Sequence, residues 1–295
     1  MTELGRLETE GRADALGDLD LRPTTDVVGT LVRANRDVLR AVEAAAPAIA
    51  ALADAAAARD GRILYAGAGT AGWTAFVDAG ELGPTFGLDA VAVVAGSEHP
   101  VGSREEAAAE DDADAGARAV AQLAPTAHDV LVAVSASGRT PFALGALDAA
   151  RAAGALTGAV ACTPGSPLAQ RADLAVEVSV GPEVVAGSTR MKGVTAQKLV
   201  LNAFSTAVAI RRGRTLGDLM TSMHVANDKL RDRAVRIVAA AADAGEDTAR
   251  AALAAAGDEL PVAVLIAAHD LDPPAARARL QAAGGNLRRA LGQSG

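Results

Sequence analysis

The feature that most constrains this chain is a repeated alternation of short apolar runs with longer helical segments. Five runs, rich in Val, Ile, Leu and Ala, lie at residues 62–66, 90–95, 129–134, 159–162 and 174–178. Helical patterns separate most of them, including a charged, Ala-rich stretch at 104–123 and another at 141–153. Strands that alternate with helices of this length predict an α/β fold with a parallel sheet covered on both faces.

The remaining segments predict helices. Residues 1–24 are polar and predict an arm, whereas the apolar spacing over 25–58 predicts one or two helices. After Gly187 the pattern changes to long helices without a strand, and after residue 245 it changes to short helical segments divided by Gly, Asp and Pro. We therefore expect four parts: an arm with helices (1–58), an α/β domain (59–222), a connecting helix (223–244) and a small helical C-terminal module (245–295).

Composition excludes several classes of partner and cofactor. The 28 Lys and Arg against 36 Asp and Glu give a net charge of −8, which argues against nucleic acid or an anionic membrane as the main partner. The single cysteine, Cys162, cannot form an internal disulfide or a cysteine-based zinc site, and we expect it in the core. His99 and His224 lack partners at metal-ligand spacing. No apolar run spans a bilayer and no secretory signal begins the chain, so we expect a cytoplasmic protein without a bound metal.

A glycine-rich turn follows the first predicted strand. Residues 67–72 fit the pattern G-x-G-x-x-G, which in this context can mark a dinucleotide-binding turn. That fingerprint also requires an acidic residue at the end of the second strand. Asp89 lies before that strand and Glu98 lies about 30 residues beyond the first glycine, so the match to a nicotinamide site is partial. A tight structural turn remains open as an alternative.

Two further loops carry hydroxyl groups into predicted helix starts. Residues 135–140 (SASGRT) follow the third strand and precede Pro141, a residue favoured in a first helical turn. Residues 187–192 (GSTRMK) open a long helix in the same way. Such starts offer donors to a phosphate, although Ser137 or Thr140 could instead only cap the helix. Three such loops favour a sugar phosphate over a dinucleotide, with candidate ligands Gly69, Thr70, Ser135, Ser137, Gly138, Arg139, Thr140, Ser188, Thr189 and Lys192.

Longer motifs resemble one family. The stretch SASGRTP at 135–141 resembles the phosphate loop of sugar isomerase (SIS) domains. Six further segments are similar to the N-acetylmuramic acid 6-phosphate etherase family, which includes the glucokinase regulatory proteins. They are GAGT (67–70), PTFG (84–87), AEDD (109–112), GPEVVAGSTRMK (181–192), TAQKLVLN (195–202) and NDKLRDRAVRIV (227–238). This resemblance implies a three-layer SIS-type sandwich, a homodimer, and a lyase that needs neither a metal nor an organic cofactor.

The resemblance also implies the site residues. The lyase releases D-lactate from its sugar phosphate and leaves N-acetylglucosamine 6-phosphate, and two glutamates of the family map onto Glu81 and Glu110. Glu183, in the GPEVVAGSTRMK segment, joins the expected phosphate-binding residues. A carboxylate suits this chemistry, because the C2 hydrogen beside the C1 aldehyde of the open-chain sugar is acidic enough to be removed. Arg190, Lys192 and Lys198 could neutralise phosphate or simply lie on a helix face.

Several residues depart from the family pattern close to the expected substrate. They include a tryptophan where arginine is usual and a Leu-Gly pair where Cys-Pro is usual; the positions are Ala71, Trp73, Gly80, Leu82, Gly83 and Ala108. These departures leave the 3-O-substituent and the N-acyl group open. Two other functions remain as alternatives: an aldose–ketose isomerase of the SIS group, and a sugar phosphate sensor without catalysis.

Overall fold

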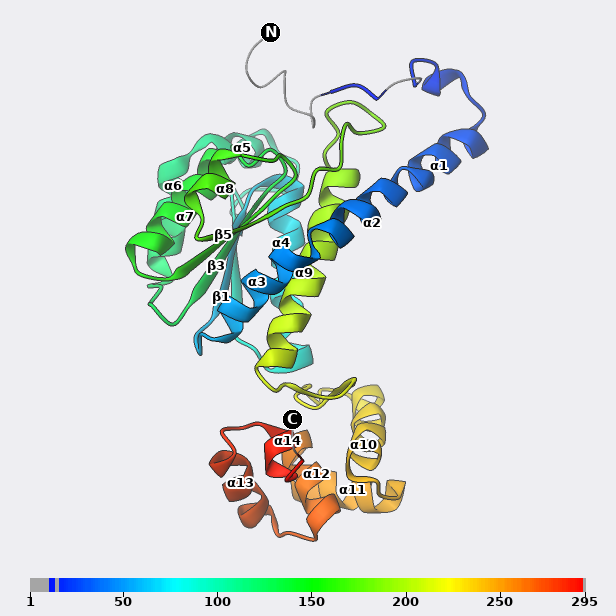
Figure 1. Ribbon diagram of the computed structural model, residues 1–295, viewed down its shortest axis with the longest axis vertical. Coiled ribbons are helices and arrows are strands. Elements are labelled where there is room, and N and C mark those ends of the chain that lie inside the picture. Colours follow the sequence, from blue (N-terminus) through cyan, green and yellow to red (C-terminus); the bar gives the residue numbers. More distant parts are fainter. Residues whose placement is uncertain (1–10, 14–15, 294–295) are drawn as a thin grey trace. The chain divides into compact units, whose positions relative to one another are not determined.

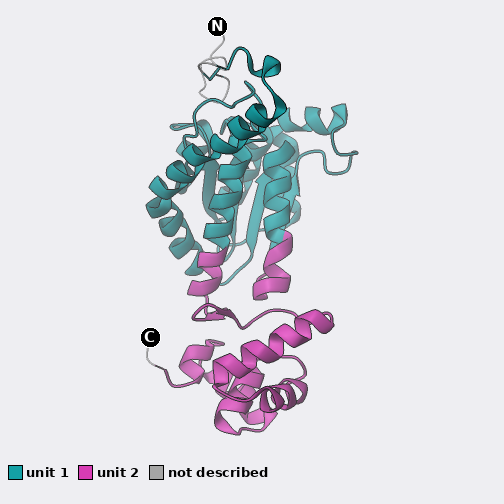
Figure 2. Ribbon diagram, turned by 90° about the vertical axis from the view of Figure 1, so that its right-hand side faces the viewer, with its two compact units in different colours: residues 1–79, 90–205 teal, residues 80–89, 206–295 magenta. Residues whose placement is uncertain are grey.

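The chain divides into two compact units (Figure 2). The computed structural model describes residues 11–13 and 16–293, and part of the predicted arm at 1–24 therefore lies outside the described residues. The first unit comprises the residues up to 79 together with 90–205, and the second comprises 80–89 together with 206–295. The finer division at residues 58, 222 and 244 stays a prediction.

Five parallel strands form the centre of the first unit. They are β1 (Ile63–Gly67), β2 (Ala90–Val94), β3 (Val130–Ser135), β4 (Leu156–Ala161) and β5 (Leu174–Glu177). Their order across the sheet is β2-β1-β3-β4-β5, with every neighbouring pair parallel. Each of the five apolar runs forms a strand, because a parallel sheet covered on both faces requires nearly continuous apolar residues. The predicted parallel sheet is confirmed.

Helices cover both faces of this sheet. Figure 1 shows α6, α7 and α8 on one side and α3, α4 and α9 on the other, which is the predicted three-layer sandwich. The described helices of this unit, two of which extend into the second, are η3 (Leu19–Leu21), α1 (Thr24–Arg33), α2 (Asn35–Ala44), α3 (Ala46–Ala57), α4 (Gly69–Phe86), α5 (Arg104–Ala108), η4 (Ala109–Asp111), α6 (Ala113–Gln122), α7 (Pro141–Ala152), α8 (Pro167–Arg171) and α9 (Lys192–Arg211).

Small residues let the outer helices α6 and α7 approach each other closely. A Cβ atom on Gly116 would lie 2.0 Å from the carbonyl oxygen of Phe142, and one on Gly145 would lie 1.9 Å from that of Ala113. Beneath them, Leu64 and Leu131 pack with alanines of α7 in a fully buried cluster. The high alanine content therefore serves a core in which short side chains bring helices and sheet close together.

The structure corrects two helix predictions. Residues 25–58, expected as one or two helices, form the three helices α1, α2 and α3. The charged segment 104–123, expected as a single helix, is divided into α5, η4 and α6. The Asp112 side chain accepts a hydrogen bond from the Ala115 amide and thereby caps a new helix. An aspartate that binds the backbone in this way favours a helix start over a helix interior, which the apolar periodicity alone does not reveal.

The second unit is mainly helical, as predicted for the C-terminal region. It contains α10 (Asp228–Ala242), α11 (Glu246–Ala255), α12 (Leu260–His269), α13 (Pro273–Ala282) and α14 (Leu287–Ala290). The expectation of no strand after Gly187 is wrong, because Thr215–Leu216 and Leu219–Met220 pair as a short antiparallel hairpin, β6 and β7, with Gly217 at φ +59° in its turn. Among the described residues, no helix combines the length and apolar character needed to cross a membrane.

Candidate active site

A cavity of about 340 Å³ lies at the carboxyl ends of β1 and β3. These two strands are central neighbours whose connections run in opposite directions across the sheet, and open α/β folds bind ligands at such a switch point. Residues that follow both strands meet here. The cavity is lined by Ala68, Gly69, Thr70, Ala71, Glu110, Ser135, Ala136, Ser137, Thr140, Thr189 and Val194.

The loop after β3, residues 135–140, is held by its own hydroxyl groups. The Ser135 hydroxyl accepts a hydrogen bond from the Gly138 amide at 3.0 Å, and the Ser137 hydroxyl accepts one from the Arg139 amide at 3.2 Å. Gly138 has φ +64°, and a Cβ atom there would lie 2.2 Å from Ser166 Oγ. Glycine is therefore required for the turn that brings the loop into the start of α7.

A chain of hydroxyl groups connects this loop to Glu110. Thr140 Oγ1 donates to Glu110 Oε1 at 2.9 Å, and Ser135 Oγ lies 2.8 Å from Thr140 Oγ1. Because a hydroxyl has one proton and that of Thr140 is used by Glu110, Ser135 is the donor to Thr140. The carboxylate is thus fixed inside the cavity by the same loop whose hydroxyl groups face it.

The loop before α9, residues 181–191, is arranged differently. The Glu183 side chain is buried, and its two oxygens accept hydrogen bonds from the amides of Lys192 and Gly193, each at 3.0 Å. Lys192 Nζ donates to the Pro182 carbonyl oxygen at 3.1 Å. A carboxylate of the chain itself therefore occupies the first amides of α9, and of the predicted hydroxyls in this loop only Thr189 lines the cavity.

The structure brings together seven of the thirteen predicted site residues. Gly69, Thr70, Glu110, Ser135, Ser137, Thr140 and Thr189 line the cavity, whereas Glu81, Gly138, Arg139, Glu183, Ser188 and Lys192 do not. Glu81 is exposed and lies in the second unit, twelve residues along α4 from Gly69. Sequence reasoning placed Ala71 close to the substrate but missed Ala68, Ala136 and Val194 of the lining. Apolar residues at the ends of buried strands and helices carry no pattern that separates lining from core.

Lys198, one of the residues that could neutralise a phosphate, does not line the cavity and pairs with an aspartate. Its Nζ lies 3.6 Å from Oδ1 of the buried Asp78, whose other oxygen accepts a hydrogen bond from the Tyr65 hydroxyl at 2.7 Å. Burial, together with the neighbouring Asp78 charge, raises the pKa of Tyr65 well above its ordinary value. These contacts connect α4, β1 and α9 through the buried Asp78 and Tyr65, with the partly exposed Lys198 at the edge.

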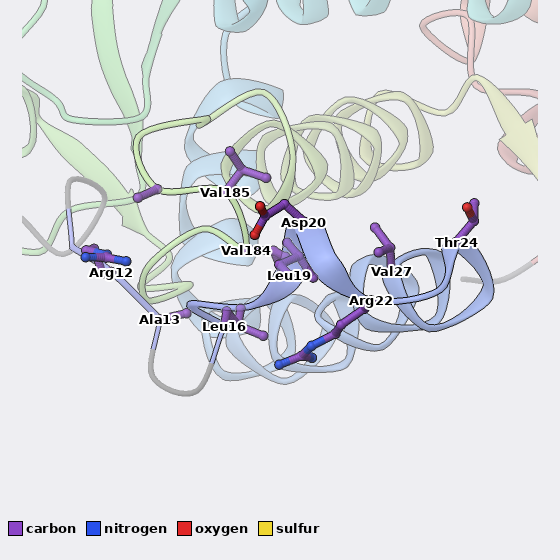
Figure 3. Close-up of a pocket in the computed structure, with 11 residues that line it drawn as sticks. Arg12, Ala13, Leu16, Leu19, Asp20, Arg22, Thr24, Val27, Val184 and Val185 are labelled. Carbon is purple, nitrogen blue, oxygen red and sulfur yellow. The ribbon is translucent and has the colours of Figure 1, made fainter.

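A second, larger cavity of about 540 Å³ lies between the N-terminal segment and the loop before α9 (Figure 3). Val184 and Val185 contribute from the loop, and Leu16, Leu19 and Val27 contribute from the N-terminal side. Two arginines also line it, Arg12 and Arg22, and Arg22 is paired with Asp18. Among the described residues that line this cavity, none is a serine and none belongs to a helix of the sandwich, so the smaller cavity is the candidate active site.

Comparisons with known proteins agree with the fold. The glucokinase regulatory protein N-terminal SIS domain matches residues 45–151, and the SIS domain matches residues 115–207. A solved chain from E. coli CFT073 is similar at a TM-score of 0.50 and 22% identity, over 67% of this chain and 97% of that one. At this identity the likeness shows the fold alone, which is that of SIS proteins.

Relatives that match over nearly the full chain identify the family more narrowly than the fold does. The protein named N-acetylmuramic acid 6-phosphate etherase from Rubrobacter xylanophilus is 46% identical over 98% of this chain and 97% of its own length. Proteins of the same name from Streptomyces avermitilis and Cutibacterium acnes are 44% and 42% identical, each over at least 97% of this chain and 94% of their own length. These matches confirm the resemblance inferred from the motifs: the chain belongs to the N-acetylmuramic acid 6-phosphate etherase family.

Proposed function

We propose that this protein is a carbon–oxygen lyase that cleaves the 3-O-lactyl ether of N-acetylmuramic acid 6-phosphate, giving N-acetylglucosamine 6-phosphate and D-lactate. The relatives of that name, matched over nearly the whole chain, support this assignment. Within the structure, one observation carries it: the Glu110 carboxylate lies in the same cavity as the hydroxyl-rich loop and accepts a hydrogen bond from the Thr140 hydroxyl. An acid–base group beside an anion-binding loop suits proton transfer on a phosphorylated sugar.

The phosphate is proposed to bind between two helix starts. Gly69 and Thr70 begin α4, and Thr140 directly precedes α7, and all three line the cavity. Helix N-termini favour anions because their first amides lack partners within the helix and the helix dipole is positive there. Ser137 adds a hydroxyl donor, and Thr189 contributes from the loop before α9.

The reaction then follows from the acidity of the open-chain sugar. A carboxylate removes the C2 proton, and the electron pair forms the C2–C3 double bond in conjugation with the C1 aldehyde. The C3–O bond breaks as a carboxyl group donates a proton to the leaving oxygen, which releases lactate with its hydroxyl group. Water adds at C3 and a proton returns to C2, so a carboxyl group must accept and donate a proton in each turnover. We assign Glu110 to proton transfer in this cycle and keep Glu81 as the second catalytic carboxyl group.

We also propose that the active form is a homodimer in the cytoplasm, working in cell wall recycling, with the site near the subunit boundary. Exposed apolar side chains on α4, Phe76 and Val77, support this assembly. So does a largely apolar surface cavity of about 410 Å³ between α4 and α9 that Val77 and Leu199 help to line. Full activity of a monomer at nanomolar concentration, measured together with its mass, would contradict the dimer.

The decisive experiment is incubation with N-acetylmuramic acid 6-phosphate while D-lactate is measured. The wild-type protein should release lactate, and Glu81→Gln should retain substrate binding with lactate release lowered roughly 100- to 10,000-fold. Formation of a ketose from a hexose 6-phosphate without lactate would favour the isomerase instead. Tight binding of the sugar phosphate without any turnover would favour the sensor.

A further inference from the structure

The helix that leads into Glu110 has a single buried side chain. α5 has five residues, and Glu106 is its single buried one, while Arg104, Glu105, Ala107 and Ala108 are exposed. A short helix without an apolar face gains little stability from packing. The position of α5 therefore depends on what holds the Glu106 carboxylate.

Two N–H donors hold that carboxylate. Trp73 Nε1, from the second turn of α4, donates to Glu106 Oε1 at 2.7 Å, and the Gly102 amide donates to Oε2. Hydrogen bonds to an ionised acceptor are about twice as strong as those between neutral groups. The Glu106 backbone is also constrained, because a Cβ atom on Gly96 in the loop after β2 would lie 2.6 Å from Glu106 Cα.

These contacts fix the position of Glu110. α5 continues directly into η4, and Glu110 follows Glu106 by four residues. Trp73 lies on the same helix as Gly69, Thr70 and Ala71 of the cavity lining. The indole bond thus ties the backbone that carries Glu110 to the helix that forms one wall of the cavity, while Thr140 holds its carboxylate from the other side.

We propose that Trp73 and Glu106 are a positioning pair that sets the location of the Glu110 carboxylate in the cavity. The pair touches no lining surface itself and acts through Glu110. This inference rests on the proposed function, because turnover is its main readout. A small misplacement of a reacting group lowers the rate strongly even when binding is retained.

The test compares Trp73→Phe, which removes only the indole N–H and keeps an aromatic ring, with Glu106→Gln. Both variants should lower kcat for lactate release about 10- to 100-fold, with KM changed by no more than about threefold. The matched control is Glu105→Gln, which removes the neighbouring exposed carboxylate and should change kcat by less than about twofold. Melting temperatures of all variants identify any loss of folding.

Two further measurements separate positioning from a general structural role. In a Glu110→Gln background, Trp73→Phe should cause no further loss of the residual rate, because the group it positions is already absent. An equal fold-loss in both backgrounds, or an unchanged kcat in both single variants, would overturn the inference. If even the wild-type protein releases no lactate, the proposed function fails instead.

The indole bond can also be tested without turnover. Trp73 is the single tryptophan of the chain, so intrinsic fluorescence reports on this indole alone. Its emission should shift in Glu106→Ala, which removes both acceptor oxygens, and stay unchanged in Glu105→Ala. An unshifted spectrum in a folded Glu106→Ala variant would contradict the pair itself.

Discussion

The loop after β3 and the loop before α9 have similar sequences, but they differ in what lies against the first turn of the helix that follows each of them. Both combine glycine, serine, threonine and a basic residue, and both precede a helix. At the loop after β3, the hydroxyl groups of Ser135, Ser137 and Thr140 line the cavity. At the loop before α9, the buried Glu183 carboxylate already occupies the first amides of the helix.

From this difference we expect an anion site only at the helix start whose amides no side chain of the described residues caps, which is that of α7 and not that of α9. Each loop is associated with one glutamate. Glu110 is half-buried and accepts a hydrogen bond from a hydroxyl group in the cavity, whereas Glu183 is buried and accepts hydrogen bonds from two backbone amides. We therefore expect the two carboxylates to serve different purposes, the first in turnover and the second in stability.

Replacement of the cavity glutamate should have the largest effect. Glu110→Gln keeps the shape of the side chain and removes its capacity to exchange a proton. We expect kcat for lactate release to fall roughly 100- to 10,000-fold with nearly unchanged substrate binding. Rapid kinetics with N-acetylmuramic acid 6-phosphate measures the rate, and calorimetry measures binding. A kcat for the Glu110→Gln variant equal to that of the wild-type protein would show that the Glu110 carboxylate does not transfer a proton in the reaction.

Burial near the loop before α9 should keep the thiol of Cys162 unreactive. Burial, and then the charge of Glu183, raise the pKa of Cys162 from its ordinary 9.0 to about 12. The thiolate is the reactive form, so at pH 9 its fraction should be about 500-fold smaller in the folded protein than in the unfolded chain. Thiol labelling with and without denaturant measures this ratio, and fast labelling of the folded protein would contradict the closed packing.

Equivalent serines in the two loops should differ in phosphate binding. Ser137→Ala removes a hydroxyl from the cavity and should weaken binding of the sugar phosphate about 10- to 100-fold, with little effect on the unphosphorylated sugar. Ser188→Ala, in the other loop, is the matched control and should change binding by about twofold or less. Equal losses in the two variants, or for the two ligands, would remove the distinction between the loops.

The smallest effect concerns stability. In Glu183→Gln one oxygen can still accept a backbone proton, but the new NH₂ group faces the other amide donor. We expect the free energy of unfolding to fall by about 1–3 kcal/mol, because a buried donor loses its partner. Denaturant titration measures this loss. A large fall in sugar phosphate affinity without a stability change would instead place Glu183 in the binding site.

The fold was largely predictable because its strands are buried on both faces. Continuous apolar runs locate β1 and β2 within about one residue of their observed bounds. β4 begins at Leu156, three residues before the predicted run, because Thr157 and Gly158 interrupt the apolar pattern. Thr157 is nevertheless fully buried, since its hydroxyl donates to Asp173 at 2.7 Å, a partner that lies too far along the chain to be recognised.

The site was predictable only in part, for a related reason. Hydroxyl and glycine patterns locate the loop after β3, since local backbone chemistry produces that loop. The role of Glu183 as a cap depends on residues nine and ten positions away, and the burial of Glu106 depends on an indole 33 positions away. A charged stretch such as 104–112 predicts a solvated surface, and only a tertiary partner shows which of its carboxylates is buried.

The division of the second unit into two separate stretches has a consequence for synthesis of the protein. Residues 80–89 leave the ribosome more than a hundred residues before the 206–295 segment that completes their unit. At about 5–20 residues per second, roughly 6–23 s pass between the synthesis of residue 89 and that of residue 206. A nascent chain arrested near residue 205 therefore carries residues 80–89 without the rest of their unit, and no single cut in the gene can separate the two units.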